Sequence, residues 1–346
     1  MDFYGFYTGS EFQAYDYLGV HMEHREAVFR TFAPNAKHIA VIGDFNQWTD
    51  TPMNRIYDGN FWECRIVGVR AGMKYKFRIY DQNGRCLDRC DPFGRFMELR
   101  PHNASIFWET EGFRFTDAKW MKRRTDQKNM PLNIYEIHAG SWRCKQSDTN
   151  DVGNEQNVEA STAGDIAKQW YTYKELAERL IPYLKENHYN YVEMMPLAEH
   201  PSDESWGYQI TSFFSPTSRY GNPDDLKTFI NRCHEENIGV LMDFVPVHFA
   251  VDDYALWKYD GTALYEYPNN DVGKSEWGSC NFMHSRGEVR SFLQSAANYW
   301  LEEFHFDGLR MDAISNLIYW QGNPARGENK SAVSFLQNMN QGLKNR

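Results

Sequence analysis

The sequence predicts an α/β protein in two parts, an antiparallel β-sandwich followed by a parallel sheet covered by helices. In the first hundred residues, turn residues separate four short strand-like runs, at 27–32, 38–42, 61–67 and 75–80. This pattern is typical of an immunoglobulin-like sandwich. In the rest of the chain, apolar strand-like runs alternate with amphipathic helical runs, which is typical of a parallel sheet.

The second part reads as four strand and helix pairs. We expect four strands, at 132–138, 191–195, 239–245 and 306–313. We expect the first and the last of these strands to be buried. We expect helices, from apolar residues at helical spacing, at 173–184, 224–236, 288–303 and 330–343. Pro223 marks the entry to the second of these helices.

The elements suggest three segments. We expect the sandwich at 1–110, a charged linker at 111–130 and the second domain at 131–346. Within the second domain, the stretch 148–164 is polar and poor in large apolar residues. We therefore expect an exposed loop there.

Charge and cysteine usage exclude several function classes. The 346 residues carry a formal net charge of -10, which argues against nucleic acid or an anionic membrane as a partner. No apolar run is long enough to be a secretion signal or to span a bilayer. The six cysteines form no CxxC pair or Cys/His cluster, which favours free thiols in the cytoplasm and no metal site. We expect no cofactor, and the oligomeric state stays open.

Aromatic residues make up 16% of the chain. The flat C–H faces of sugar rings pack on aromatic rings, so this surplus fits a glycan-binding protein. Trp48 and Trp62 are candidates for a stacking platform. Both residues fit a position in the core between the two sheets at least as well.

The last predicted strand carries a charged pair. The two-residue period of a strand puts Arg310 and Asp312 on one face, at the strand's C-terminal end. A neighbouring guanidinium keeps a carboxylate ionised. An ionised, positioned Asp is the nucleophile that covalent glycosyl transfer requires. An ordinary structural ion pair would give the same pattern.

Two stretches of the second part resemble known motifs. They are Gly239-Val-Leu-Met-Asp-Phe-Val-Pro-Val-His248 and Phe306-Asp-Gly-Leu-Arg-Met-Asp-Ala313. In order, spacing and residue type they resemble regions I and II of the α-amylase clan of glycoside hydrolases, family 13. The resemblance implies that the second part is the first half of a (β/α)8 TIM barrel.

Further stretches narrow the resemblance. Glu199-His-Pro-Ser-Asp-Glu-Ser-Trp-Gly-Tyr-Gln209 and Phe214-Ser-Pro-Thr-Ser-Arg-Tyr-Gly-Asn-Pro-Asp225 resemble the branching-enzyme subgroup of that family. The run from Phe32 to Trp48 resembles the family-48 carbohydrate-binding module that precedes such barrels. The implied partner is an α-glucan such as glycogen or amylose.

The resemblance implies three catalytic residues. Asp312 would be the nucleophile that forms a β-linked glycosyl-enzyme intermediate, and Arg310 would hold it ionised and oriented. Asp243 would support the surroundings of the nucleophile. Barrel active sites form at the C-terminal ends of strands, where these residues lie.

The resemblance also implies four substrate-binding residues. His248 would hydrogen-bond a hydroxyl group of the bound glucose. Tyr208 would stack beneath the sugar at the cleavage site, beside Gln209 and in the same loop as Trp206.

The implied activity is glucan branching, in which an α-1,4-glucan is cleaved with retention and the severed chain passes to a 6-hydroxyl group. Retaining chemistry also needs an acid/base carboxyl group about 5 Å from the nucleophile, which the family takes from a Glu on the fifth strand. After Asp312 the sequence holds one Glu, Glu328 in a Gly/Pro loop, and no Asp or His. We therefore expect an N-terminal portion of a branching enzyme that is inactive alone, with an unpaired strand at each side.

Two alternatives stay open at this stage. A debranching or trehalose-releasing hydrolase of family 13 would share the two strand motifs. A non-catalytic glycan-binding protein would use only the β-module and the half cleft.

Overall fold

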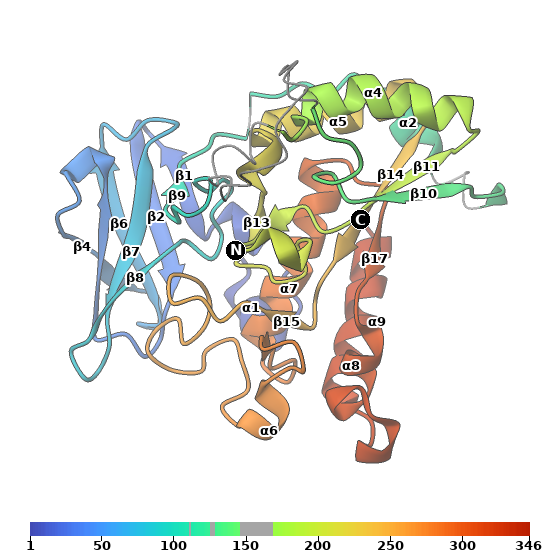
Figure 1. Cartoon of the computed structure of the whole chain (residues 1–346). Helices are drawn as coiled ribbons and strands as arrows, with labels where there is room; N and C mark the ends of the chain where they lie inside the picture. Colours follow the sequence, from blue (N-terminus) through green and yellow to red (C-terminus); the bar gives the residue numbers. More distant parts are fainter. Residues whose placement is uncertain (111, 125–128, 146–168) are drawn as a thin grey trace, which may run out of the picture.

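The computed structural model describes residues 1–110, 112–124, 129–145 and 169–346 (Figure 1). The β-sandwich and a helix-covered parallel sheet lie side by side. The expected loop at 148–164 lies outside the described residues. Within the described part of the chain, no helix is long and apolar enough to cross a membrane. All six cysteines are free.

The first part is a sandwich of two antiparallel sheets. One sheet has the order β1-β2-β6-β5, and the other has the order β4-β3-β7-β8 with β9 beside β7. The strands are β1 (Gly19–Glu23), β2 (Glu26–Phe32), β3 (His38–Gly43), β4 (Thr51–Pro52), β5 (Asn54–Ile56), β6 (Phe61–Val67), β7 (Lys74–Tyr80), β8 (Cys86–Arg89) and β9 (Ser105–Ile106). The four strands predicted from the sequence are confirmed as β2, β3, β6 and β7.

The inner faces of the two sheets form the core of the sandwich. In β7, Tyr75, Phe77 and Ile79 alternate with half-buried polar residues and are themselves buried, as expected for a strand with one face on a core. Trp62 is also core, because it is 3% exposed and its indole N–H donates to the carbonyl oxygen of Ala33. Trp48 is 38% exposed. Of the two tryptophans, only Trp48 is therefore available for stacking.

The second part is built on a parallel sheet with the strand order β10-β11-β14-β17. These strands are β10 (Ile134–Ile137), β11 (Tyr191–Met194), β14 (Gly239–Phe244) and β17 (Gly308–Met311). The helices that follow them are α4 (Tyr173–Glu186), α5 (Pro223–Glu235), α7 (Gly287–Glu303) and α9 (Lys330–Lys344). This is the predicted half barrel, and the described residues form an open sheet rather than a closed barrel.

Two of the helices begin at capping boxes. At α4, the Thr172 side chain accepts from the backbone N–H of Glu175, and Glu175 accepts from the N–H of Thr172. At α5, Asn222 and Asp225 make the same reciprocal pair, with Pro223 in the first turn. These bonds satisfy N–H groups that have no partner within the helix.

The prediction that the first and last strands are buried is wrong. In β10, Ile134 is 39% exposed, and in β17 the side chain of Arg310 is exposed while its neighbours are half-buried. Among the described residues, both strands lie at the edges of the sheet, where each pairs with a strand on one side only. The central strands β11 and β14 are largely buried.

The sequence analysis missed the sandwich strands β1, β4, β5, β8 and β9, and outside the sandwich it missed several further short elements. They are α1 (Phe3–Thr8), α2 (Ala118–Arg123), β12 (Ala198–Glu199), β13 (Ser212–Pro216), β15 (His248–Phe249), α6 (Asn270–Gly273), β16 (Cys280–Asn281) and α8 (Ile314–Ile318). The proposed segment boundaries near 110 and 130 stay predictions. Helix α2 lies within the expected linker, and its Trp120 meets Tyr191 of β11 edge-on and donates a hydrogen bond to Asp307 at 2.8 Å.

Helix α1 lies between the sandwich and α7, because its Phe6 ring packs on Phe32 and Phe61 of the sandwich while its backbone is bound by α7. The Ser291 hydroxyl donates to the Phe6 carbonyl at 3.0 Å, and the Gln294 amide donates to the Gly9 carbonyl at 2.9 Å. A Cβ atom at Gly287 would collide with the Tyr7 carbonyl oxygen. The polar stripe of α7 is therefore a docking site for the N-terminal backbone.

The sandwich and the parallel sheet share one continuous hydrophobic core. Phe93, which follows the last long sandwich strand, stacks on Phe214 with ring centroids 4.9 Å apart and meets Phe292 edge-on at 5.4 Å. Such aromatic pairs contribute about 0.5–1.5 kcal/mol beyond their buried area.

A buried Asp–His–Asp cluster joins α2 to the parallel sheet. His234 Nδ1 lies 2.8 Å from Asp117 and His234 Nε2 lies 3.0 Å from Asp307. Burial lowers the pKa of His234, but the bonds to the two carboxylates outweigh it and raise the pKa above its ordinary value. Burial likewise raises the pKa of Asp117, but the bonds from His234 and His305 bring it below its ordinary value.

We predict that Gly287→Ala destabilises the protein by about 1–3 kcal/mol, because the added methyl group has to displace the α1 backbone. Denaturant unfolding of the full chain measures this cost. Gly112→Ala is the matched control, since nothing lies within 4 Å of the added atom there. Equal stability of the two variants would contradict the docking of α1.

We predict that Asp117→Asn costs more stability near pH 6 than near pH 9. A raised His pKa contributes stability below the unfolded pKa of about 6.5 and loses it as the pH rises through the folded value. The lowered pKa of Asp117 limits the contribution only in acid. Urea unfolding at the two pH values tests this, with exposed Glu204→Gln as the control. A cost that does not change with pH would contradict the charged state of His234.

Candidate active site

The candidate site lies at the C-terminal ends of β14 and β17. Asp243 and Arg310 are register partners on these neighbouring parallel strands. The Nη1 atom of Arg310 donates to Asp243 Oδ1 and to Asp312 Oδ1, each at 2.8 Å. The Asp312 N–H donates to the Phe244 carbonyl at 3.0 Å, which extends the strand pairing to this residue. One guanidinium nitrogen therefore holds two carboxylates together.

Asp243 is the buried member of this group, with 0% exposure. Burial raises its pKa, and the hydrogen bonds from Tyr208 and Arg310 oppose that rise. The Tyr208 hydroxyl donates to Asp243 Oδ2 at 2.6 Å. For Arg310, burial lowers the pKa, but the bond to Asp243 outweighs it and the pKa is raised. Arg310 is therefore a fixed cation between two carboxyl groups.

A tight turn brings Tyr208 to Asp243. Gly207 has φ +92°, and a Cβ atom there would meet the carbonyl oxygen of Pro196, so the position requires glycine. Trp206 before it is also left-handed, with φ 54°. On the other side of the site, Ala313 directly follows Asp312 with φ 47°. Such conformations in non-glycine residues cluster at functional sites.

A buried ion network anchors the loop that carries Tyr208. Arg219, whose side chain is 1% exposed, lies 2.7 Å from both Glu199 and Asp203. Asp203 also receives a hydrogen bond from Arg100 at 2.7 Å. Removing one member of a buried ion pair typically costs 3–5 kcal/mol. The network therefore holds the loop in place before any ligand binds.

His248 lies on β15, close to Asp312 and so beside the group formed by Asp243, Arg310 and Asp312. Its Nδ1 atom is hydrogen-bonded to the Ser279 hydroxyl at 2.6 Å. Burial lowers the pKa of His248 to about 4, so its ring is neutral at physiological pH. Its other nitrogen, Nε2, makes no hydrogen bond to the described part of the chain. The ring lies 5.2 Å from the Trp277 ring.

The structure brings most of the predicted residues together in two groups. Asp312, Arg310, Asp243 and Tyr208 form one hydrogen-bonded chain. His248 and Gln209 belong to a second group around Trp277, where the Gln209 amide donates to the Trp277 carbonyl at 3.4 Å.

Trp206 lies apart from both groups. It is 57% exposed, and its ring lies 6.4 Å from that of His138. It makes no hydrogen bond to either group within the described residues.

Sequence reasoning gave no role to several residues around this site. Trp277 is 46% exposed beside His248. Glu136 and Glu193 are register partners on β10 and β11. Burial raises the pKa of Glu193, and the negative charges of Asp243 and Glu136 add to this effect. The strand alternation marks these carboxylates, but nothing in the local pattern links them to Asp243.

Glu328 lies in the loop between α8 and α9. It forms an isolated bridge with Tyr319 and does not stand at the end of a strand, in agreement with its interpretation from the sequence.

Among the described residues, no group of three or more His, Cys, Asp and Glu side chains could hold a metal ion.

Comparisons with known protein families agree with the two-part fold. Residues 17–94 match the family described as carbohydrate-binding module 48, the isoamylase N-terminal domain. Residues 166–262 match the alpha amylase catalytic domain. A crystal structure of a Salmonella typhimurium protein of the alpha-amylase type aligns with a TM-score of 0.69 at 22% identity, covering 94% of this chain and 47% of that one. This likeness confirms the predicted fold class.

The curated relatives are similar over almost the entire chain. The 1,4-alpha-glucan branching enzyme GlgB of Fusobacterium nucleatum is 42% identical over 99% of this chain and 53% of its own length. The enzymes of the same name from Bacillus caldolyticus and Nitrosospira multiformis are 38% and 41% identical over 99% and 98% of this chain. The chain spans about half the length of these relatives. The family resemblance expected from the sequence is confirmed.

We predict that Tyr208→Phe raises the pKa of Asp243 further, because the substitution removes a hydrogen bond that stabilises the carboxylate. Carbon-13 NMR titration of the Asp243 carboxyl group in the full chain measures this change. The exposed Tyr57→Phe variant is the control. If the Asp243 titration were the same in both variants, Tyr208 would not hold this carboxylate.

Proposed function

We propose that this chain, which carries a carbohydrate-binding module 48 followed by the first part of an alpha-amylase catalytic domain, is the glucan-binding and nucleophile-bearing portion of a 1,4-α-glucan branching enzyme. Its partner would be a glucan of the glycogen or amylose type, and its role glycogen biosynthesis in the cytoplasm. The observation that carries the proposal is the single Arg310 nitrogen shared by Asp243 and Asp312.

In the first step, an oxygen of Asp312 attacks C1 of a glucose unit in the α-1,4-glucan. The bond from C1 to the leaving O4 breaks, and a β-linked glycosyl ester forms. Arg310 keeps Asp312 in place for this attack. Since Asp243 is buried and bound by both Arg310 and Tyr208, it fixes the direction of the guanidinium.

In the second step, the 6-hydroxyl group of an acceptor glucan attacks C1 from the opposite face. The ester bond breaks, and an α-1,6 linkage forms with the original configuration. An acid/base carboxyl group protonates the leaving O4 and later takes the proton of the acceptor. Glu328, bridged to Tyr319 in a loop, does not suit that role.

Tyr208, Gln209 and His248 would bind the glucose unit whose bond is cleaved. Tyr208 offers an aromatic face directly beside the carboxylates, since its hydroxyl contacts Asp243. His248 is neutral, and its Nε2 atom has no hydrogen-bond partner among the described residues, so it can hydrogen-bond a sugar hydroxyl without a charge. Trp206, exposed in the same loop, would contact a more distant unit of the chain.

The sandwich would bind a second stretch of glucan through Trp48. This residue, with Lys76 and Asn103, lines an open pocket of about 420 Å³ on the outer face of the β3–β7 sheet. An exposed aromatic ring flanked by polar side chains suits a sugar, which has an apolar face and a hydroxyl edge.

A chimera tests the catalytic roles. Residues 1–346 would be joined to the remaining part of the Fusobacterium nucleatum relative and given amylose. We expect α-1,6 branch points, and a rate lowered about 10³-fold or more by Asp312→Asn. Glu328→Gln is the matched control and should change little. Free reducing ends without branch points would instead support a hydrolase.

The 346-residue chain alone should bind glycogen but form no α-1,6 branches. Glycogen pull-down measures binding, and isoamylase treatment of incubated amylose followed by chain-length analysis measures branching. Trp48→Ala should weaken the pull-down. Branching by the chain alone would contradict the proposal, and binding without any activity in the chimera would support a non-catalytic glycan-binding protein.

A further inference from the structure

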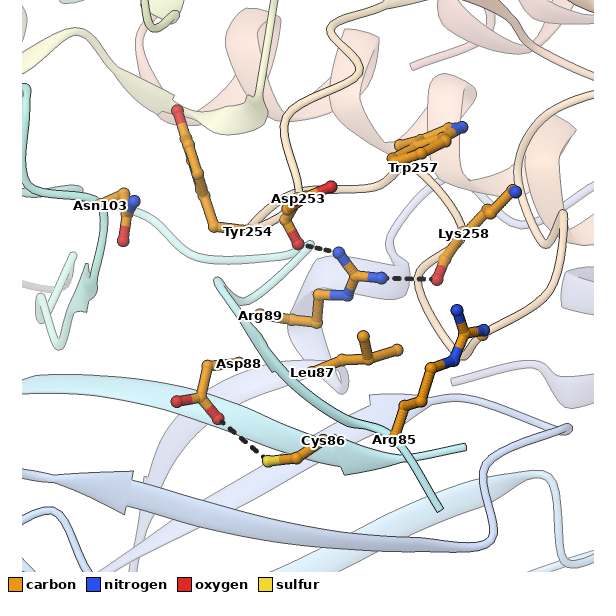
Figure 2. Close-up of a pocket in the computed structure, with 11 residues that line it drawn as sticks. Arg85, Cys86, Leu87, Asp88, Arg89, Asn103, Asp253, Tyr254, Trp257 and Lys258 are labelled. Carbon is orange, nitrogen blue, oxygen red and sulfur yellow. Dashed lines mark hydrogen bonds between the residues drawn. The ribbon is translucent and has the colours of Figure 1, made fainter. Parts of the chain in front are cut away.

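A cleft of about 460 Å³ lies where the sandwich meets the second domain, away from the carboxylate site (Figure 2). One wall is β8, with Arg85 just before it. The other wall is the segment from Asp253 to Gly261, which follows β15. Asn103 closes one end. The two structural units therefore build the cleft jointly.

Arg89 fixes the two walls relative to each other. Although it lines the cleft, it is only 3% exposed. Its guanidinium donates to the carbonyl oxygens of Lys258 at 2.7 Å and Tyr259 at 3.1 Å, and also to that of Asp253. The Cys90 N–H adds a bond to the Tyr254 carbonyl at 2.6 Å. The cleft is thus preorganised, which lowers the entropy cost of binding a ligand.

An aromatic ring lines the cleft on the side of the second domain. Trp257 is half-buried, and the exposed Lys258 ammonium lies 4.9 Å from its ring centroid. A cation–π contact at an exposed site is weak. A sugar ring can therefore take the place of the ammonium on the ring, and the ammonium can donate to the hydroxyl groups of that sugar.

The charges in the cleft are largely compensated within the protein. Arg85 pairs with Asp81 at 2.8 Å, and Asp88 pairs with Arg78 at 2.7 Å. The donors of Arg89 are used by main-chain carbonyls. Paired charges of both signs favour a neutral ligand with many hydroxyl groups over a phosphorylated one.

The cleft is continuous with the Trp48 pocket. Asp88 and Asn103 line both. A single surface therefore runs from Trp48 on the sandwich, past these two polar side chains, to Trp257 on the second domain.

We propose that this surface is a glucan-binding site shared by the two domains, in which a linear α-1,4-glucan lies across the junction with one glucose ring on Trp257. Arg85, Lys258 and Asn103 bond its hydroxyl groups. The inference rests on the proposed glucan substrate. It adds a second anchor, which holds the glucan to the catalytic part independently of the carboxylate site.

The test uses the full chain and maltoheptaose. The indole N–H resonance of Trp257, assigned with Trp257→Phe, should shift on titration. In calorimetry, Trp257→Ala should weaken binding about tenfold. Lys258→Ala and Arg85→Ala, which remove exposed side chains, should each weaken it about threefold. Tyr4→Ala, which removes a 79% exposed aromatic outside the cleft, is the matched control.

The outcomes separate this inference from the proposed function. Binding that is lost in Trp48→Ala but unchanged in the three cleft variants, with no Trp257 shift, would overturn the shared site and leave glucan binding intact. Displacement of maltoheptaose from Trp257 by inorganic phosphate would contradict the inference that the cleft takes a neutral ligand. No binding of maltoheptaose or glycogen by the unaltered chain would overturn both proposals.

Discussion

The buried carboxylate of Asp243 is the constraint around which the second domain is arranged. A carboxylate without solvent is tolerated only if strong donors satisfy it, and here Arg310 and Tyr208 donate at 2.8 Å and 2.6 Å. These donors come from the next strand and from a loop more than thirty residues earlier in the chain. Satisfying Asp243 therefore brings Asp312 and the aromatic ring of Tyr208 to the same place, and the Arg219 network holds the loop that makes this possible.

The stability of the open parallel sheet depends on its packing against the sandwich. Its central strands are buried, but in the described part of the chain β10 and β17 each have one unpaired edge, which is a liability for any sheet. The continuous core around Phe93, the Arg89 bonds to the opposite wall and the docking of α1 on α7 give the half barrel a large fixed surface to pack against. The same junction that stabilises the fold also forms the cleft with Trp257, so structure and the inferred second glucan site share one interface.

The sequence predicted the features that depend on local patterns. Strands β2, β3, β6 and β7 and helices α4, α5, α7 and α9 follow from their periodicity, and the site residues stand at the ends of strongly patterned strands. The partial exposure of β10 and β17 could not be predicted, because an apolar pattern does not reveal whether a neighbouring strand is present. The docking of α1 was missed because α7 receives it with Ser291 and Gln294 rather than an apolar stripe. Trp277 and Arg219 act through contacts that loops make across the fold, for which no local signal exists.

The most direct test of the nucleophile uses a substrate that needs no acid catalyst. Fluoride leaves C1 without protonation, so a 5-fluoro-α-maltosyl fluoride can transfer its glycosyl group to a carboxylate in the 346-residue chain. Intact-protein mass spectrometry with peptide mapping would locate the new ester. The account predicts one glycosyl group per chain, on Asp312, and none in Asp312→Asn. No adduct, or an adduct on another carboxylate such as Glu193, would contradict it.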